Sequence, residues 1–290
     1  MRVLHLTDRL SARGGADWHL LGVMAEQVRR GHEVIVAVGR RDPGVVTPAQ
    51  VVEVPVLADG RRLAPVSMAL PQADVVHVHN AIGPAVLRWV ATKNGLATVQ
   101  DHRSFCPGRG KLTAAGEVCR VAMSADACAD CFDDPGYRDA IVALTGERRD
   151  ALRGMAAVVV LSRYMQAELA DVGIDATVIP PFVHCLRHTG EAPANRQRDC
   201  VLFAGRLVDA KGVRDAIAAW READVDLPLV IAGTGSLRRA PDFAALTAGV
   251  EVLGWVPHER FGALLARAHA LLLPSRWQEP FGIVGLEALW

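Results

Sequence analysis

Residues 200–221 read CVLFAGRLVDAKGVRDAIAAWR and contain one complete structural unit in order. The apolar run at 200–204 predicts a buried strand, the glycine-bounded stretch 205–212 predicts a loop, and 212–221 predicts a helix. A strand followed by a loop and a helix is the unit from which parallel sheets with helices on both faces are built. This stretch therefore predicts an α/β fold.

The same alternation runs through the chain on both sides of this unit. Before it we expect strands at 2–6, 34–38, 51–54, 74–78, 98–99, 157–161 and 177–179, and helices at 16–30, 81–93, 137–153 and 163–171. After it we expect strands at 229–232, 250–253 and 270–273, a helix at 259–267 and another from 281.

Residues 181–199 interrupt this rhythm with prolines and scattered charges, which predict a linker. We therefore expect two doubly wound domains, at 1–180 and at 200–290. The sequence stops at Trp290, close to the helix that begins at 281, whereas a doubly wound domain normally continues with further strands. The second domain is accordingly expected to be incomplete.

The composition is that of a globular protein, with 290 residues, 51% hydrophobic and 22% charged. The 32 basic and 32 acidic residues cancel, so no overall field favours nucleic acid as a partner. No targeting signal and no run of about 18 apolar residues is visible in the sequence. We expect a cytoplasmic protein, and a peripheral membrane contact is left open.

Glycine-containing stretches follow several of the expected strands. Gly14 and Gly15 open the first helix, where backbone amides can approach an anion, although a Gly-Gly pair is also an ordinary tight turn. In the second domain GRLVDAKG holds Gly205, Arg206 and Lys211, and two cations at a helix start suit a diphosphate better than they suit the helix dipole. The alternative is a pair of solvated charges. The stretch AGTGS adds two further glycines, Gly233 and Gly235.

The last stretch, SRWQEPFGIVGLEALW, places two carboxylates eight residues apart. Glu279 lies just before the helix and Glu287 about two turns into it, so both can face one cleft. Carboxylates accept hydrogen bonds well from sugar or ribose hydroxyls. A surface acid is the ordinary interpretation of either residue alone, and it fits the whole string less well.

Seven stretches together resemble glycosyltransferase family 4: GGADWHLL (14–21), VVHVHN (75–80), VIPPF (178–182), VLFAGRLVDAKG (201–212), LVIAGTGS (229–236), VEVLGWVP (250–257) and EPFGIVGLE (279–287). The resemblance runs in the correct order along the whole chain, and the Glu-x7-Glu motif is its most specific part. It implies the GT-B fold, in which two Rossmann-like domains face a cleft, and a retaining transfer from a nucleotide-sugar donor without a protein nucleophile or a catalytic metal.

The resemblance also implies roles for individual residues. Arg206 and Lys211 would hold the diphosphate, Glu279 would contact donor-sugar hydroxyls, and Glu287 would contact the ribose. The remaining donor-side or acceptor-side residues are Gly14, Gly15, Asn80, Gln100, Asp101, Ser162, Gly205, Gly233, Gly235, Phe281, Gly282, Ile283 and Val284. The expected donor is UDP- or GDP-linked, and the acceptor is left open among a glycan, a lipid and a small molecule.

Residues 100–107, QDHRSFCP, depart from the family pattern His-Asp-x4-Cys-Pro because Gln100 stands where a histidine is common. If the backbone is extended, His102 points to the same side as Gln100 and can take over the catalytic role. Gln100 itself can supply the hydrogen bond without titrating, and His102 as a plain loop residue is the third alternative.

Four cysteines, Cys106, Cys119, Cys128 and Cys131, lie in an excursion at 103–136. Their number and the Cys-x2-Cys spacing fit a structural tetrahedral zinc. Free thiols, or a redox pair at Cys128 and Cys131, are the alternatives.

Other functions also fit parts of the sequence. An epimerase of the same architecture would act on the nucleotide sugar without an acceptor, and a non-catalytic nucleotide-sugar-binding protein would only hold it. A dinucleotide oxidoreductase fits less well, because AGTGSLR lacks the third glycine of the Gly-x-Gly-x-x-Gly fingerprint.

Overall fold

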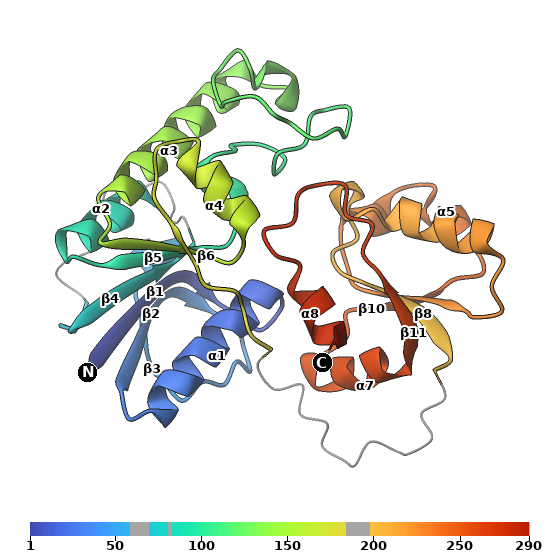
Figure 1. Cartoon of the computed structure of the whole chain (residues 1–290), viewed down its shortest axis with the longest axis horizontal. Coiled ribbons are helices and arrows are strands. Elements are labelled where there is room, and N and C mark those ends of the chain that lie inside the picture. Colours follow the sequence, from blue (N-terminus) through green and yellow to red (C-terminus); the bar gives the residue numbers. More distant parts are fainter. Residues whose placement is uncertain (59–69, 81–82, 184–197, 290) are drawn as a thin grey trace. The chain divides into compact units, whose positions relative to one another are not determined.

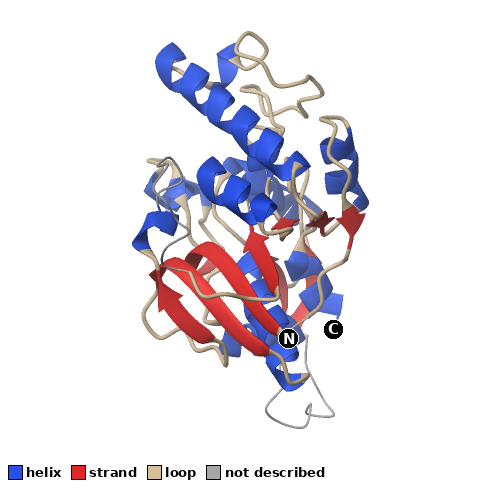
Figure 2. Cartoon of the chain, turned by 90° about the vertical axis from the view of Figure 1, so that its left-hand side faces the viewer, coloured by secondary structure: helices blue, strands red, loops and turns tan. Residues whose placement is uncertain are grey.

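The amino-terminal part of the chain forms a seven-stranded parallel sheet (Figures 1 and 2). The computed structural model describes residues 1–58, 70–80, 83–183 and 198–289. The strands are β1 (Arg2–Leu10), β2 (Glu33–Arg41), β3 (Gln50–Glu53), β4 (Val75–His79), β5 (Leu96–Val99), β6 (Ala157–Val160) and β7 (Thr177–Val178). All strands are parallel, and their order across the sheet is β3-β2-β1-β4-β5-β6-β7. Successive strands are added on one side of β1 up to β3 and on its other side from β4 onward, as in the doubly wound sheets that bind dinucleotides.

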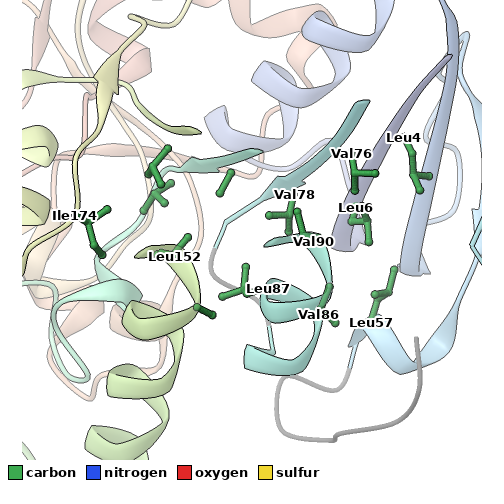
Figure 3. Close-up of a cluster of buried hydrophobic side chains, with 14 of the residues drawn as sticks. Leu4, Leu6, Leu57, Val76, Val78, Val86, Leu87, Val90, Leu152 and Ile174 are labelled. Carbon is green, nitrogen blue, oxygen red and sulfur yellow. The ribbon is translucent and has the colours of Figure 1, made fainter. Parts of the chain in front are cut away.

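Helices cover both faces of this sheet: α1 (Gly15–Arg29), α2 (Pro84–Thr92), α3 (Pro135–Arg153) and α4 (Arg163–Ala170). Because side chains alternate along a strand, neighbouring strand residues enter different cores. Leu4 and Leu6 of β1 pack in the core that includes Leu87 of α2 and Leu152 of α3 (Figure 3). On the other face, Val36 of β2 packs with Met24 of α1.

The carboxy-terminal part forms a second, four-stranded parallel sheet in the order β10-β9-β8-β11. Its strands are β8 (Cys200–Ala204), β9 (Leu229–Ala232), β10 (Glu251–Gly254) and β11 (Ala268–Leu272). Its helices are α5 (Val213–Ala223), α6 (Phe243–Leu246), α7 (His258–Arg267) and α8 (Ile283–Leu289). Two cores again form, one around Ile217 of α5 and one around Leu264 of α7.

The α/β fold with two Rossmann-like sheets is thus confirmed. The chain divides into two compact units, residues 1–114 with 119–182, and residues 115–118 with 183–290. We call them the N-unit and the C-unit. The division after Phe182 falls within the expected linker 181–199, of which residues 184–197 lie outside the described part.

Some element bounds differ from the expectation. β1 continues to Leu10 rather than residue 6, because parallel pairing with β2 carries on through Arg9 and Leu10 although the side chains become polar. Helix α2 begins at Pro84 after Gly83, and residues 81–82, also expected in it, lie outside the described part. The sequence pattern did not predict the short helix α6 or the 3₁₀ helices η1 (Pro55–Ala58), η3 (His102–Ser104), η4 (Ala129–Cys131), η5 (Asp209–Lys211) and η6 (Ser236–Arg239).

Within the described residues, every helix is too short or too polar to cross a membrane.

Candidate functional site

Loops of the C-unit meet at the carboxyl ends of its strands with their backbones in close contact. A Cβ atom at Gly233, just after β9, would lie 1.8 Å from the carbonyl oxygen of Gly205, just after β8. A Cβ atom at Gly212 would lie 1.9 Å from the carbonyl oxygen of Pro274, which follows β11. Only glycine leaves room for such contacts. The loops that carry the predicted donor-binding residues are therefore packed together.

Three of the predicted residues are gathered on these loops. Lys211 donates a hydrogen bond from Nζ to Glu279 Oε1 over 2.5 Å, and Ser275 Oγ donates to the same oxygen over 2.5 Å. The indole of Trp277 lies beside both cations, with the Lys211 Nζ at 4.9 Å and the Arg206 guanidinium carbon at 5.2 Å from the ring centroid. Arg206 is exposed, whereas Lys211 and Glu279 are mostly buried.

Glu279 is held as a carboxylate by this arrangement. Burial raises its pKa, but the charge of Lys211 and the hydrogen bonds from Lys211 and Ser275 lower it more, so the pKa lies below the usual value. A fixed anion and a fixed cation thus stand together at the edge of a parallel sheet, where open α/β folds bind their ligands. The sequence did not single out Ser275 or Trp277.

Glu287 has a different partner. It lies on α8, and its Oε1 is 3.1 Å from His258 Nε2 at the start of α7, with both side chains about nine-tenths buried. Phe281 and Gly282 precede α8, which begins at Ile283, and Val284 packs on the core around Leu264. The contact with His258 is one that sequence spacing gives no means of finding.

The N-unit contains a polar cavity of about 300 Å³ at the carboxyl ends of β1 and β4. Two predicted residues, Asn80 and Gln100, line it. Its other lining residues are Thr7, Asp8, Arg9, Leu10, Ser11, Arg13, Ala16, Asp17, Leu20, Arg40 and His79.

The glycine pair at the start of α1 lies between Arg13 and Ala16, which line this cavity, but the first amide of the pair is already hydrogen-bonded. The backbone N–H groups of Arg13 and Gly14 donate to Asp17 Oδ2 over 3.1 and 2.9 Å. Burial raises the pKa of Asp17, while these hydrogen bonds and that of Ser11 work against the rise. A carboxylate of the chain itself therefore occupies the position expected for a ligand anion at Gly14, and Gly15 begins the helix.

Gln100 is held at the cavity by two neighbours. Its Nε2 donates to His19 Nδ1 over 2.8 Å, and its backbone N–H donates to Asn80 Oδ1 over 3.3 Å. The side-chain Oε1 of Gln100 is buried without a hydrogen-bond partner. A buried acceptor without a partner is unfavourable for stability.

His102 lies elsewhere in the N-unit. The backbone is extended at Asp101 but turns into η3 at His102, so the two side chains at 100 and 102 do not follow a strand. The His102 ring is buried against Phe105, with centroids 5.5 Å apart, and it is not among the residues that line the cavity. Its catalytic role stays a prediction.

Asp101 and Ser162 act locally as helix caps. Asp101 accepts hydrogen bonds from the backbone N–H and the guanidinium of Arg103. Ser162 Oγ accepts from the N–H of Met165 at the start of α4. Both contacts are typical of residues that end a strand and start a helical turn.

Three histidines lie together beneath α1. His5 on β1 and His79 on β4 are joined by a hydrogen bond of 2.9 Å, and His77 lies with them. Burial lowers the pKa of His5 to about 4 and lowers those of His77 and His79 as well, with a further lowering from the neighbouring imidazoles. The three rings are therefore neutral at neutral pH.

The four cysteines of the excursion lie in one neighbourhood of the structure. The N–H of Lys111 donates to Cys106 Sγ over 3.3 Å. Burial raises the pKa values of Cys128 and Cys131, and the nearby thiols of Cys106 and Cys119 raise them further. In the part of the chain that is described, the cysteines do not form a group whose ligand atoms all lie within 4.8 Å. The zinc site stays a prediction.

Two parallel Rossmann-like sheets, each with polar residues at the carboxyl ends of its strands, are the architecture of the GT-B class of proteins. Residues 14–181 match the family model "Glycosyl transferase 4-like domain", and residues 188–290 match "Glycosyl transferases group 1". The chain belongs to this glycosyltransferase family.

Individual relatives are similar over different lengths. The glycogen synthase of Mycobacterium tuberculosis is 40% identical over 124 residues, which are 40% of this chain and 28% of the relative. The phosphatidyl-myo-inositol mannosyltransferase of Propionibacterium freudenreichii is 26% identical over 294 aligned residues, which are 95% of this chain and 71% of the relative. The chain thus spans only part of these relatives.

Among solved structures, Anabaena HepE in complex with UDP-glucose superposes with a TM-score of 0.64 at 16% identity, covering 100% of this chain and 78% of HepE. At this identity the similarity establishes the fold.

Proposed function

We propose that this protein is a retaining glycosyltransferase that moves a sugar, of hexose type, from a nucleoside-diphosphate sugar to an acceptor hydroxyl. Membership of the glycosyltransferase family supports this proposal. The observation that carries it is the contact between Lys211 and Glu279, with Arg206 beside them on Trp277.

The proposed sugar transfer requires that the departing nucleoside diphosphate be stabilised. Lys211 and Arg206 present positive charge at the carboxyl edge of the C-unit sheet, and Glu279 with Trp277 fixes the position of Lys211 before any ligand arrives. Charge that is already oriented stabilises a developing anion without reorganisation. The carboxylate of Glu279 has further lone pairs that can accept hydrogen bonds from donor-sugar hydroxyls.

The proposed donor is a UDP- or GDP-linked sugar. The solved structures of Anabaena HepE with UDP and with UDP-glucose support a nucleotide sugar as the ligand of this fold. The proposed acceptor side is the N-unit cavity, because it offers hydroxyl-binding groups at Asp8, Asn80 and Gln100. We place Gln100, rather than a titrating histidine, at its floor.

We also propose that Cys106, Cys119, Cys128 and Cys131 hold a structural zinc ion. Their mutual proximity and the N–H···S hydrogen bond from Lys111 to Cys106 support this set of ligands. Metal analysis of the purified protein tests it, and four freely reactive thiols with little bound zinc would contradict it.

The main experiment measures donor binding and turnover in parallel. The purified chain is screened against UDP- and GDP-sugars by calorimetry, and product sugar and nucleoside diphosphate are quantified by mass spectrometry. We expect Lys211→Ala and Arg206→Ala to reduce kcat by about 100-fold or more, the size of effect seen when an oriented charge-stabilising donor is removed. Lys211→Ala also removes a partly buried ion pair, so thermal unfolding is measured in parallel, and we expect the loss of turnover to be much larger than the loss of stability.

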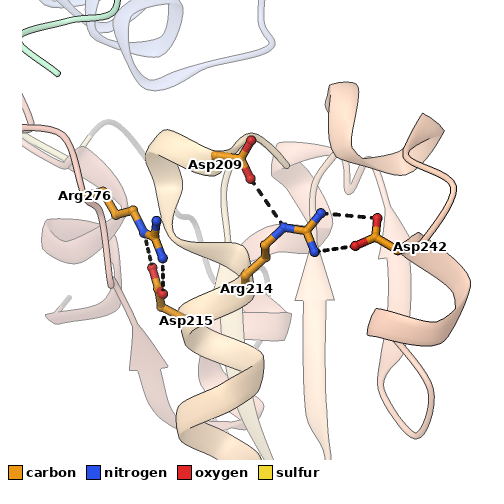
Figure 4. A network of polar contacts seen from close by, with 5 residues as sticks. All are labelled: Asp209, Arg214, Asp215, Asp242 and Arg276. Carbon is orange, nitrogen blue, oxygen red and sulfur yellow. Dashed lines mark hydrogen bonds and ion pairs between the residues drawn. The ribbon is translucent and has the colours of Figure 1, made fainter. Parts of the chain in front are cut away.

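Arg214→Ala is the matched control. Arg214 is another cation of the C-unit, but it pairs with Asp209 and Asp242 on the surface of α5 (Figure 4). Its removal should leave turnover close to the wild-type value, since exposed ion pairs contribute about 0–1 kcal/mol. Near-normal turnover in Lys211→Ala would reject the assigned site.

The products distinguish the alternatives. A retaining transferase gives a glycosylated acceptor with the anomeric configuration of the donor, which NMR of the product reads directly. An epimerase gives an altered nucleotide sugar without acceptor, and a binding protein gives affinity without turnover. Inversion at the anomeric carbon would reject the retaining mechanism.

A further inference from the structure

Three imidazoles converge from two neighbouring strands of the N-unit sheet. His77 and His79 are two residues apart on β4, so their side chains leave the same face of the strand. His5 lies opposite His77 in the parallel register of β1 with β4 and shares that face. A pair at i and i+2 with a third residue on the next strand is a compact way to bring three ligands to one point.

The distances suit a metal ion. Each histidine has a ring nitrogen that lies within 4.8 Å of a ring nitrogen of both others. Among the described residues, no other three histidine, cysteine, aspartate or glutamate side chains come together in this way. His5 Nδ1 and His79 Nε2 are 2.9 Å apart. Zinc–nitrogen bonds of about 2.0–2.1 Å in a tetrahedral site separate two ligand nitrogens by about 3.3–3.4 Å. The His5 and His79 nitrogens would need to part by only a few tenths of an ångström, and the His77 nitrogen lies within 4.8 Å of the group.

The outer nitrogens of two of the rings are already held by hydrogen bonds. His5 Nε2 donates to Gln27 Oε1 of α1 over 2.7 Å, and His77 Nε2 is hydrogen-bonded to Thr98 Oγ1 of β5 over 2.7 Å. Metal-binding histidines characteristically have the other ring nitrogen fixed in this way, because it sets the tautomer and the ring orientation. His5 Nδ1 and His77 Nδ1 are then the nitrogens left for an ion.

The third ring, that of His79, has one nitrogen hydrogen-bonded to His5 and the other without a partner. Because His5 Nε2 carries a proton for Gln27, His5 Nδ1 accepts the hydrogen bond from His79 Nε2–H, which leaves His79 Nδ1 as a bare acceptor. This atom is buried with no hydrogen-bond partner, in a side chain that is 1% exposed. If an ion replaced the His79–His5 hydrogen bond, the proton would move to His79 Nδ1. Of the three histidines, His79 is the one that also belongs to the lining of the N-unit cavity.

We propose that His5, His77 and His79 form a binding site for a divalent transition-metal ion of the zinc class on one face of strands β1 and β4. Three imidazoles suit zinc, nickel or copper rather than magnesium or calcium, which prefer oxygen ligands. The ion would cross-link β1 to β4 beneath α1, and a tetrahedral ion would keep a fourth position that this trio does not fill.

The experiment uses the chain with all six cysteines changed to serine, Cys185 and Cys200 as well as Cys106, Cys119, Cys128 and Cys131, so that no thiol can bind the metal. After treatment with a chelator, the protein is titrated with Zn²⁺ and with Co²⁺, and bound metal is counted by mass spectrometry. We expect a single bound ion per chain, with a cobalt spectrum free of thiolate-to-metal absorption. His77→Ala and His79→Ala should lose the ion, while His269→Ala, an exposed histidine of the C-unit, should keep it.

Two further measurements keep the test decisive if a variant unfolds. Thr98→Val removes only the partner of His77 and should weaken Zn²⁺ binding by about 10–100-fold while circular dichroism stays native. In the chain with its cysteines intact, His77→Ala should lower bound zinc by one ion without altering the thiolate absorption of the cobalt form. Two results would overturn the proposal and show a neutral, hydrogen-bonded group of histidines instead. One is the absence of a bound ion in the serine variant, and the other is metal binding that His77→Ala, His79→Ala and Thr98→Val all leave unchanged.

Discussion

Lys211 and Glu279 lie 68 residues apart in the sequence and meet through a single charged hydrogen bond. Burial alone would push Glu279 toward its neutral form, and the lysine reverses that preference. The pair therefore keeps a carboxylate available as a hydrogen-bond acceptor in a partly buried position. This balance can be tested by removing the cation.

In Lys211→Met we expect the pKa of Glu279 to rise above its wild-type value, since burial then faces only the remaining hydrogen bonds. In the wild type, the pKa of Glu279 is lower in the folded state than in the unfolded state. Glu279 therefore stabilises the fold fully at pH values above its unfolded-state pKa, and this contribution is lost as the pH falls through its folded-state pKa. The variant should lose part or all of this contribution.

Carbon-13 NMR of the glutamate carboxyl, recorded against pH, measures the shift directly. Lys93→Met is the control, because Lys93 lies over Trp89 in the N-unit and its removal should leave the Glu279 titration unchanged. An unchanged Glu279 pKa in Lys211→Met would mean that the cation does not set it.

At the scale of elements, glycines decide how closely the C-unit loops approach each other. Gly233 has a φ of 153°, in the region that favours glycine, and a Cβ there would overlap the carbonyl oxygen of Gly205. At Gly146 on α3, by contrast, no atom lies within 4 Å of the position that a Cβ would take. A side chain fits there, so the packing does not require glycine.

We therefore expect Gly233→Ala to lower the free energy of unfolding by about 2–4 kcal/mol, combining backbone strain with overpacking. Gly146→Ala should raise it by about 0.5–1 kcal/mol, because alanine loses less backbone entropy in a helix. Urea unfolding followed by circular dichroism measures both. Equal effects of the two changes would contradict the packing of these loops.

The elements themselves were largely readable from sequence. Apolar runs such as 200–204 predicted strands correctly, since buried parallel strands need continuous apolar residues. The end of β1 was missed because Thr7, Asp8 and Arg9 are polar, and only pairing with β2 shows that the strand continues. Helix η3 was also missed, because three residues are too few to show a periodic pattern. The backbone turns into η3 at His102, and His102 is not among the residues that line the cavity with Gln100.

At the scale of the whole molecule, the two units have separate hydrophobic cores. Leu87 is fully buried in the core of the N-unit that joins α2 to the sheet, and Leu202 is fully buried in the C-unit. Among the described residues, each of these two cores is made of residues of one unit. Local loss of packing should therefore remain local.

We expect Leu87→Ala to destabilise the N-unit by about 2–5 kcal/mol, the range for a large-to-small change in a packed core. Hydrogen exchange by mass spectrometry should show faster exchange in β1, β4 and β5 and unchanged exchange in β8 and β9. Leu202→Ala should give the reverse pattern. Equal loss of protection in both units after either substitution would show that the chain unfolds as one cooperative body.

The sequence by itself determined the α/β class, the two sheets and the family, because periodicity and short motifs are local properties that survive without knowledge of contacts. It also named Arg206, Lys211 and Glu279, and the structure brings them together. Only the tertiary structure decided which partners these and other side chains have: Asp17 on the amide of Gly14, His258 on Glu287, and His5 beside His77 and His79. The contact of His258 with Glu287, and that of His5 with His77 and His79, join residues from different helices or strands. These side chains therefore come together only when the chain has folded.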